Sequence, residues 1–121
     1  MAKVLGVGGV FFKAADPKAV NDWYARVLGF EISKWGGATW PHPALGQTVW
    51  TAFAADTDHF APSNAPFMIN FIVDDLDGVL AKAKAEGAEL AGEPTSDDYG
   101  KFGWLMDPAG VKIELWQPPQ E

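Results

Sequence analysis

The 121-residue chain has the size of one domain and a globular composition, with 48% hydrophobic residues and six tryptophans. It contains no cysteine, which excludes disulfides, a thiol nucleophile and thiolate metal sites and fits a reducing cytoplasm. The net charge of −7, without a basic patch, argues against a nucleic-acid partner. No apolar run is long enough for a membrane helix, and we therefore expect a cytoplasmic protein.

The first half of the chain has the pattern of one helix between strands. Asp16 fits the N-cap of a helix over about 17–28, Pro17 fits its first turn, and Gly29 fits the left-handed position that ends it. Apolar residues recur on one face of this helix, at Val20, Trp23, Tyr24, Val27 and Leu28. Strands are predicted over residues 6–14, 30–35 and 48–53, with a loop rich in glycine and proline at 36–47.

The second half repeats this pattern in a constant register. Asp75 lies 59 positions after Asp16, and Val79 lies 59 positions after Val20. This repeat predicts a second helix at about 76–86 that follows a strand. We therefore predict one α+β domain made of two similar βαβββ modules. The first module spans about 4–55, the linker about 56–66, and the second module about 67–119.

The C-terminal stretch is predicted to form a β-hairpin. Asp107-Pro108-Ala109-Gly110 suits a type I turn, because Asp favours its first position, Pro its second and Gly its fourth. In the second arm Val111, Ile113 and Leu115 alternate with Lys112, Glu114 and Trp116. Either the face that carries Glu114 lines a cavity, or its charged residues only cover a solvated sheet surface.

Three segments together resemble the vicinal oxygen chelate superfamily, which includes glyoxalase I, extradiol dioxygenases and bleomycin-resistance proteins. FFKAADPKAVNDWYARVLGFEI is similar to the opening of its first module, FMINFIVDDLDGVLAKAKAEGAEL to that of its second, and YGKFGWLMDPAGVKIELWQPP to its closing hairpin. The resemblance implies two βαβββ modules forming one U-shaped mixed sheet around a cavity, with the helices outside. It also implies a homodimer.

Enzymes of this superfamily hold a divalent metal with two side chains from each module. The corresponding positions are Gly9, Met68, Glu114 and a residue near 48–51, and no Asp or Glu occurs between residues 31 and 56. Glycine has no side chain, and the thioether of Met68 suits Cu(I), so we expect no divalent metal and no other cofactor. His42 lies in a loop and His59 in the linker, which places neither on a predicted cavity strand.

Strand alternation predicts which residues would share the cavity face with Gly9, Met68 and Glu114. For residues 48–53 two registers are open, one with Trp50 on this face and one with Phe53, and we favour the first. The predicted ligand-binding residues are Phe11, Lys13, Trp50, Met68, Asn70, Trp116 and Glu114. An apolar, aromatic pocket with few polar groups is typical of a small-molecule site, although the same aromatics would also suit core packing or a dimer contact.

We accordingly predict a glyoxalase/bleomycin-resistance-like protein that lacks the usual metal site and sequesters a small cationic or aromatic organic ligand. The alternative is a glyoxalase-related lyase or isomerase in which Glu114 is the catalytic base or the sole protein ligand of a metal. A third possibility is an interaction protein with a vestigial pocket. No nucleophilic triad and no phosphate-binding loop is readable in the sequence.

Overall fold

The computed structural model describes residues 7–120, which form a mixed sheet with two helices. The helices are α1 (Pro17–Leu28) and α2 (Leu76–Ala85). The strands are β1 (Ile69–Ile72), β2 (Glu89–Leu90), β3 (Thr95–Asp97), β4 (Gly100–Met106) and β5 (Lys112–Gln117). No helix in this part of the chain has the length and hydropathy needed to cross a membrane.

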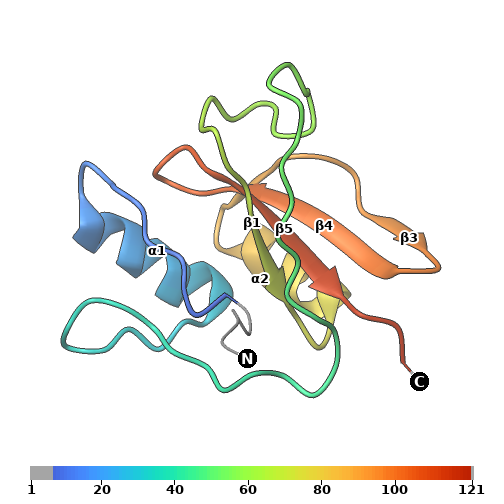
Figure 1. Ribbon diagram of the computed structural model, residues 1–121. Helices are drawn as coiled ribbons and strands as arrows, with labels where there is room; N and C mark the ends of the chain where they lie inside the picture. Colours follow the sequence, from blue (N-terminus) through green and yellow to red (C-terminus); the bar gives the residue numbers. More distant parts are fainter. Residues whose placement is uncertain (1–6, 121) are drawn as a thin grey trace, which may run out of the picture.

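The sheet is built around the hairpin of β4 and β5 (Figure 1). β5 pairs in parallel with β1 on one side and antiparallel with β4 on the other, while β2 and β3 both pair antiparallel with β4. The amide of Gly110 donates to the carbonyl of Asp107 at 3.1 Å, which closes the predicted turn. The Asp107 carboxylate accepts two further backbone bonds, from Ala109 and Val111, and thereby holds the turn from inside.

Both predicted helices are confirmed, together with their N-caps. Asp16 accepts a hydrogen bond from the amide of Ala19, and Asp75 accepts one from the amide of Gly78. α1 ends at Gly29, which has a φ of 73° and therefore occupies the left-handed region that glycine adopts without strain. Capping and the glycine stop thus limit α1 to the length that the sequence predicts.

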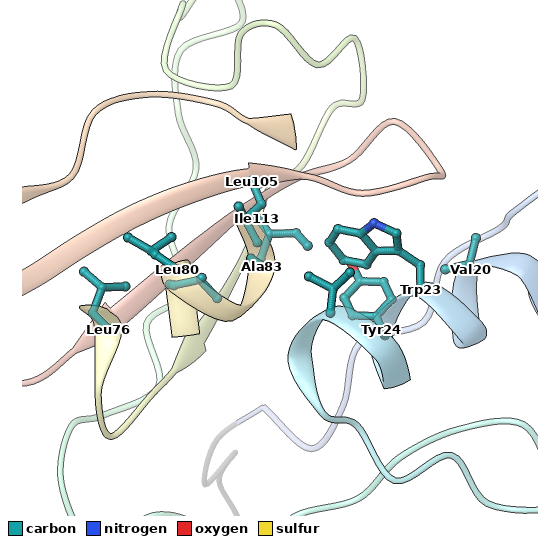
Figure 2. Packing of buried hydrophobic residues seen from close by; sticks show 10 residues of the cluster. Val20, Trp23, Tyr24, Leu76, Leu80, Ala83, Leu105 and Ile113 are labelled. Atoms are coloured by element: carbon teal, nitrogen blue, oxygen red, sulfur yellow. The ribbon is translucent and has the colours of Figure 1, made fainter. Parts of the chain in front are cut away.

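The hydrophobic core lies between the helices and one face of the sheet. Figure 2 shows Leu76, Leu80 and Ala83 of α2 packed beside Leu105 and Ile113 of the sheet, next to the α1 side chains. Gly103 of β4 lies under α2, because a Cβ built on it would lie 3.1 Å from a methyl group of Leu80. The predicted inward set of the last strand is confirmed: Val111, Ile113 and Leu115 are all buried.

A buried hydrogen bond joins the two halves of the chain. The Tyr24 hydroxyl on α1 donates to Oδ2 of Asp107 at 2.6 Å, in the turn between β4 and β5. Burial, and then the hydrogen bond to Asp107, raises the pKa of Tyr24 far above its usual value of 10.0. On the surface, Arg26 connects α1 to the end of α2 by donating to the backbone carbonyl of Glu86 at 2.8 Å.

The strands predicted in the first half do not form in the described residues. The segments 7–14, 30–35 and 48–53 run without ladder pairing, and residue 6 of the first predicted strand lies outside the described residues. The stretch 30–40 nevertheless packs through Phe30 and Trp40 against Phe71 of β1. Alternating apolar residues favour an extended chain, but a strand also requires a partner edge for its backbone groups. Large apolar side chains of these segments are therefore left exposed: Val7, Val10, Phe11, Phe12, Trp35, Trp40, Val49, Trp50 and Phe53.

Candidate functional site

The face of the sheet opposite the core carries two rows of side chains that cross the strands. In the first row, Asn70 of β1, Glu114 of β5 and Trp104 of β4 lie side by side in register. In the second row, Ile72, Trp116 and Phe102 occupy the same three strands, one pleat further along. The period of two along each strand, combined with the register, thus gathers one carboxylate and three aromatic rings on one face.

Glu114 is the polar centre of this face. Its Oε1 accepts a hydrogen bond from the Asn70 amide at 2.7 Å, and its Oε2 accepts one from the Trp104 indole N–H at 2.9 Å. The His59 ring approaches from outside the sheet, with Nε2 3.7 Å from Oε2. The Glu114 side chain is only 15% exposed, so the carboxylate is held in place by donors on both neighbouring strands.

The aromatic rings of the two rows are nearly parallel. Phe102 lies 6.3 Å from Trp116 with an interplanar angle of 6°, and 6.5 Å from Trp104 with an angle of 14°. The Trp116 ring is further fixed because its N–H donates to the carbonyl of Tyr99 at 2.8 Å. Gly100 makes this geometry possible, since a Cβ at its φ of 117° would lie 3.1 Å from the Trp116 ring nitrogen.

Lys112 belongs to the same face and is buried, with 7% of its surface exposed. Its ammonium lies 5.6 Å from the centroid of Trp104 and donates to the carbonyl of His59 at 2.7 Å. Trp104 therefore contacts a cation with its ring face and an anion with its N–H. The Lys112 ammonium and the Glu114 carboxylate, two residues apart on β5, thus both contact the Trp104 indole.

Residues 45–60 lie over this face. Gly46 is next to Trp116 and Ile72, since a Cβ on it would lie 3.3 Å and 3.0 Å from their side chains. Further along, Phe53 stacks on His59 with the centroids 5.4 Å apart. Figure 1 shows this green segment running in front of β1 and β5. A pocket of about 320 Å³ lies beyond Trp116, lined by Leu45, Gly46, Gln47, Trp116, Pro118, Pro119 and Gln120.

The residues predicted for ligand binding fall into two groups. Asn70, Glu114 and Trp116 lie together on the sheet face, and Met68 is half-buried just before β1. Phe11, Lys13 and Trp50 lie on the unpaired first-half segments, where Phe11 is 93% and Trp50 83% exposed. The side chains of Phe11, Lys13 and Trp50 are therefore largely exposed and add little buried surface to the site.

Four residues of the site were not predicted from the sequence as site residues. Phe102 and Trp104 could have been found by counting back through the turn, because an antiparallel hairpin sets Trp104 opposite Glu114. Lys112 was placed on the correct face, but its burial depends on the loop above it. His59 carries no local signal, since only tertiary folding brings the linker to Glu114.

The residues present do not fit the divalent metal that the superfamily implies. Among residues 7–120 no three His, Asp or Glu side chains lie close enough together to hold an ion. Both oxygens of Glu114 already accept hydrogen bonds, and His59 is the single imidazole beside it in this part of the chain. A catalytic zinc site needs about three protein ligands, so this donor set falls short.

Comparisons with known proteins identify the family. The chain matches the Glyoxalase-like domain family over residues 9–116 and therefore belongs to it, within the vicinal oxygen chelate superfamily. A comparison with curated proteins finds no match.

Solved structures share the mixed α+β fold. A glyoxalase/bleomycin resistance protein/dioxygenase domain from Frankia sp. EAN1pec is 14% identical, with a TM-score of 0.63 and 97% of this chain and 100% of that chain covered. An antibiotic binding protein from Streptomyces sp. CB03234 is 19% identical, with a TM-score of 0.54 and coverage of 88% and 89%. A glyoxalase/bleomycin resistance protein from the same organism is 20% identical, with a TM-score of 0.53 and coverage of 86% and 93%. At these identities the likeness shows the fold alone.

Proposed function

We propose that this protein binds a small organic ligand with an aromatic ring system on the sheet face around Glu114. The observation that carries the proposal is the cluster of three rings from the two rows, in which Phe102 is nearly parallel to both Trp104 and Trp116, next to a fixed carboxylate. A flat ring can stack beside such rings, while Glu114 accepts a hydrogen bond from an amine or other cationic group of the ligand. One structurally similar protein is described as antibiotic-binding, which supports a sequestering role.

We also propose that the site works without a divalent metal or another cofactor. Of the superfamily's four metal-ligand positions only Glu114 carries a suitable side chain, and it is engaged by Asn70 and Trp104. In this proposal the carboxylate is a recognition group. Metal analysis of protein purified without chelator tests it: near-stoichiometric zinc, nickel, manganese or iron that disappears in Glu114→Ala would contradict it.

The proposed active form is a homodimer in the cytoplasm, in which the first-half segments complete the paired βαβββ modules and the U-shaped sheet. Support comes from the exposed apolar side chains of these segments and from β1, which lies at the end of the strand order. A monomer rarely leaves so much apolar surface exposed. Light scattering at micromolar concentration should give twice the 13.1 kDa chain mass, and a value equal to the chain mass would contradict the dimer.

A lyase or isomerase of the glyoxalase type is the second candidate. The specific observation in its favour is the distance of 3.7 Å between His59 and Glu114, since a carboxylate beside an imidazole can serve as a proton-transfer pair. Conversion of the hemithioacetal of glutathione and methylglyoxal, with and without added nickel or zinc, tests this candidate. Turnover that Glu114→Gln abolishes would favour the enzyme over the binding protein.

Tryptophan fluorescence provides the direct test of binding. Titration with proflavine, a planar aromatic cation, should quench the emission to saturation at one molecule per chain. Trp116→Leu should weaken binding by about tenfold or more, because it removes a stacking surface. The matched control Trp35→Leu removes a tryptophan that is 70% exposed and lies off the sheet, and its affinity should stay within about twofold. Equal losses in both variants would refute the proposed site.

A further inference from the structure

Lys112 is almost fully buried, with 7% of its surface exposed, and its ammonium is a charge on this face that the proposed function has not yet used. Among residues 7–120, no carboxylate forms an ion pair with it. Its contacts there are one backbone carbonyl, that of His59, and the face of Trp104. Burying a charged group costs several kcal/mol unless it is paired. A lysine without a carboxylate partner among residues 7–120, on a proposed binding face, is therefore suited to an acceptor group supplied by a ligand.

The position of this lysine relative to Glu114 sets the chemistry of that partner. Lys112 and Glu114 are two residues apart on β5 and point to the same side, and Trp104 contacts both. The ammonium has three N–H groups, of which one donates to the His59 carbonyl. The remaining donors are strong hydrogen-bonding groups for an anionic or carbonyl oxygen.

We infer that Lys112 is a specificity-determining residue, which binds a negatively charged or carbonyl oxygen of the same aromatic ligand whose donor group meets Glu114. The inference rests on the proposed binding function and narrows its ligand class. The site then selects aromatic compounds with an acceptor oxygen at one end and a donor at the other. A purely cationic ring satisfies Glu114 and leaves Lys112 uncompensated.

Three probes that each contain a planar three-ring system and differ in charge test this inference by tryptophan fluorescence. Anthraquinone-2-sulfonate is a planar aromatic anion, proflavine a planar cation, and rhodamine 110 carries both kinds of group. Wild-type protein should bind the sulfonate and rhodamine 110. Lys112→Met should weaken sulfonate binding by about tenfold or more, as expected for loss of a hydrogen bond to a charged group. Its affinity for proflavine should be unchanged or higher.

Two further variants separate ligand recognition from loop tethering and net charge. Lys112→Arg keeps the cation and should retain sulfonate binding to within a few-fold. Lys101→Met removes the same charge from a lysine that pairs with Asp77, and it should change each affinity by less than about twofold. Denaturation curves establish that each variant is folded.

The outcomes are distinct. If Lys112→Met weakens all probes equally, or leaves sulfonate binding unchanged, Lys112 is a tether for the loop at His59 and the inference fails. If the wild type binds proflavine and not the sulfonate, the inference fails while the proposed binding function stands. If no probe binds to the wild type, the proposed function fails with it.

Discussion

Tyr24→Phe should destabilise the fold by about 2 kcal/mol, which is the prediction that the structure supports most directly. The substitution removes the hydroxyl that donates to Asp107 at 2.6 Å, and both residues are buried, with 4% and 6% of their surface exposed. A hydrogen bond to a charged group contributes about 1.5–3 kcal/mol. At an unfolding entropy of about 2.1 cal/mol/K per residue, a loss of about 2 kcal/mol lowers the Tm of this chain by about 8 °C.

Urea denaturation followed by circular dichroism, at one fixed protein concentration, measures this loss. The midpoint should fall with an unchanged m-value. Tyr99→Phe is the matched control, because Tyr99 is 76% exposed, and it should stay within about 0.5 kcal/mol of wild type. In a double-mutant cycle with Asp107→Asn, the two losses should not add. A Tyr24→Phe loss below about 0.5 kcal/mol would show that the backbone donors alone hold Asp107, and would refute the coupling between the two halves.

Burial and the hydrogen bond raise the folded-state pKa of Tyr24 above its value in the unfolded chain. Above pH ~10 the unfolded chain therefore loses this proton while the folded chain keeps it. The free energy of unfolding of wild type should then fall by up to about 1.4 kcal/mol per pH unit. The advantage of wild type over Tyr24→Phe should therefore shrink in urea melts above pH ~10, and a constant difference would contradict the assignment. Gly100→Ala should destabilise the fold by about 2 kcal/mol or more in urea melts, because the added Cβ collides with a carbonyl of β5. Gly110 has a φ of 81° but lies in open space, so Gly110→Ala should cost only about 1 kcal/mol. Equal losses would contradict this account. The stability of Glu114→Gln should stay within about 1 kcal/mol of wild type, since the amide oxygen still accepts a hydrogen bond from Trp104. Glu114→Leu, which removes the acceptor, should cost about 1–3 kcal/mol. A Gln variant that loses more than about 1 kcal/mol would mean that the negative charge itself stabilises the fold.

The elements that could be predicted from the sequence are those fixed by neighbouring residues. Asp16 and Asp75 cap their helices through amides three residues away, and Gly29 ends α1 through its own backbone freedom. The turn that begins at Asp107 and the inward face of β5 follow in the same way from turn chemistry and a period of two. The family could be identified for the same reason, since its motifs are these local signals in order.

The site depended on contacts between distant parts of the chain. Alternation placed Glu114 off the core face, but its donors on β1 and β4 follow from strand register, and His59 reaches it only through the path of the linker. The strands predicted at 30–35 and 48–53, and the described part, 7–14, of the strand predicted at 6–14, do not pair, which also could not be predicted from local sequence. Apolar alternation extends the chain, yet a ladder forms only where a partner edge is available. Local sequence sets the conformation of each segment, whereas the pairing of segments depends on the free energy of the whole assembled sheet.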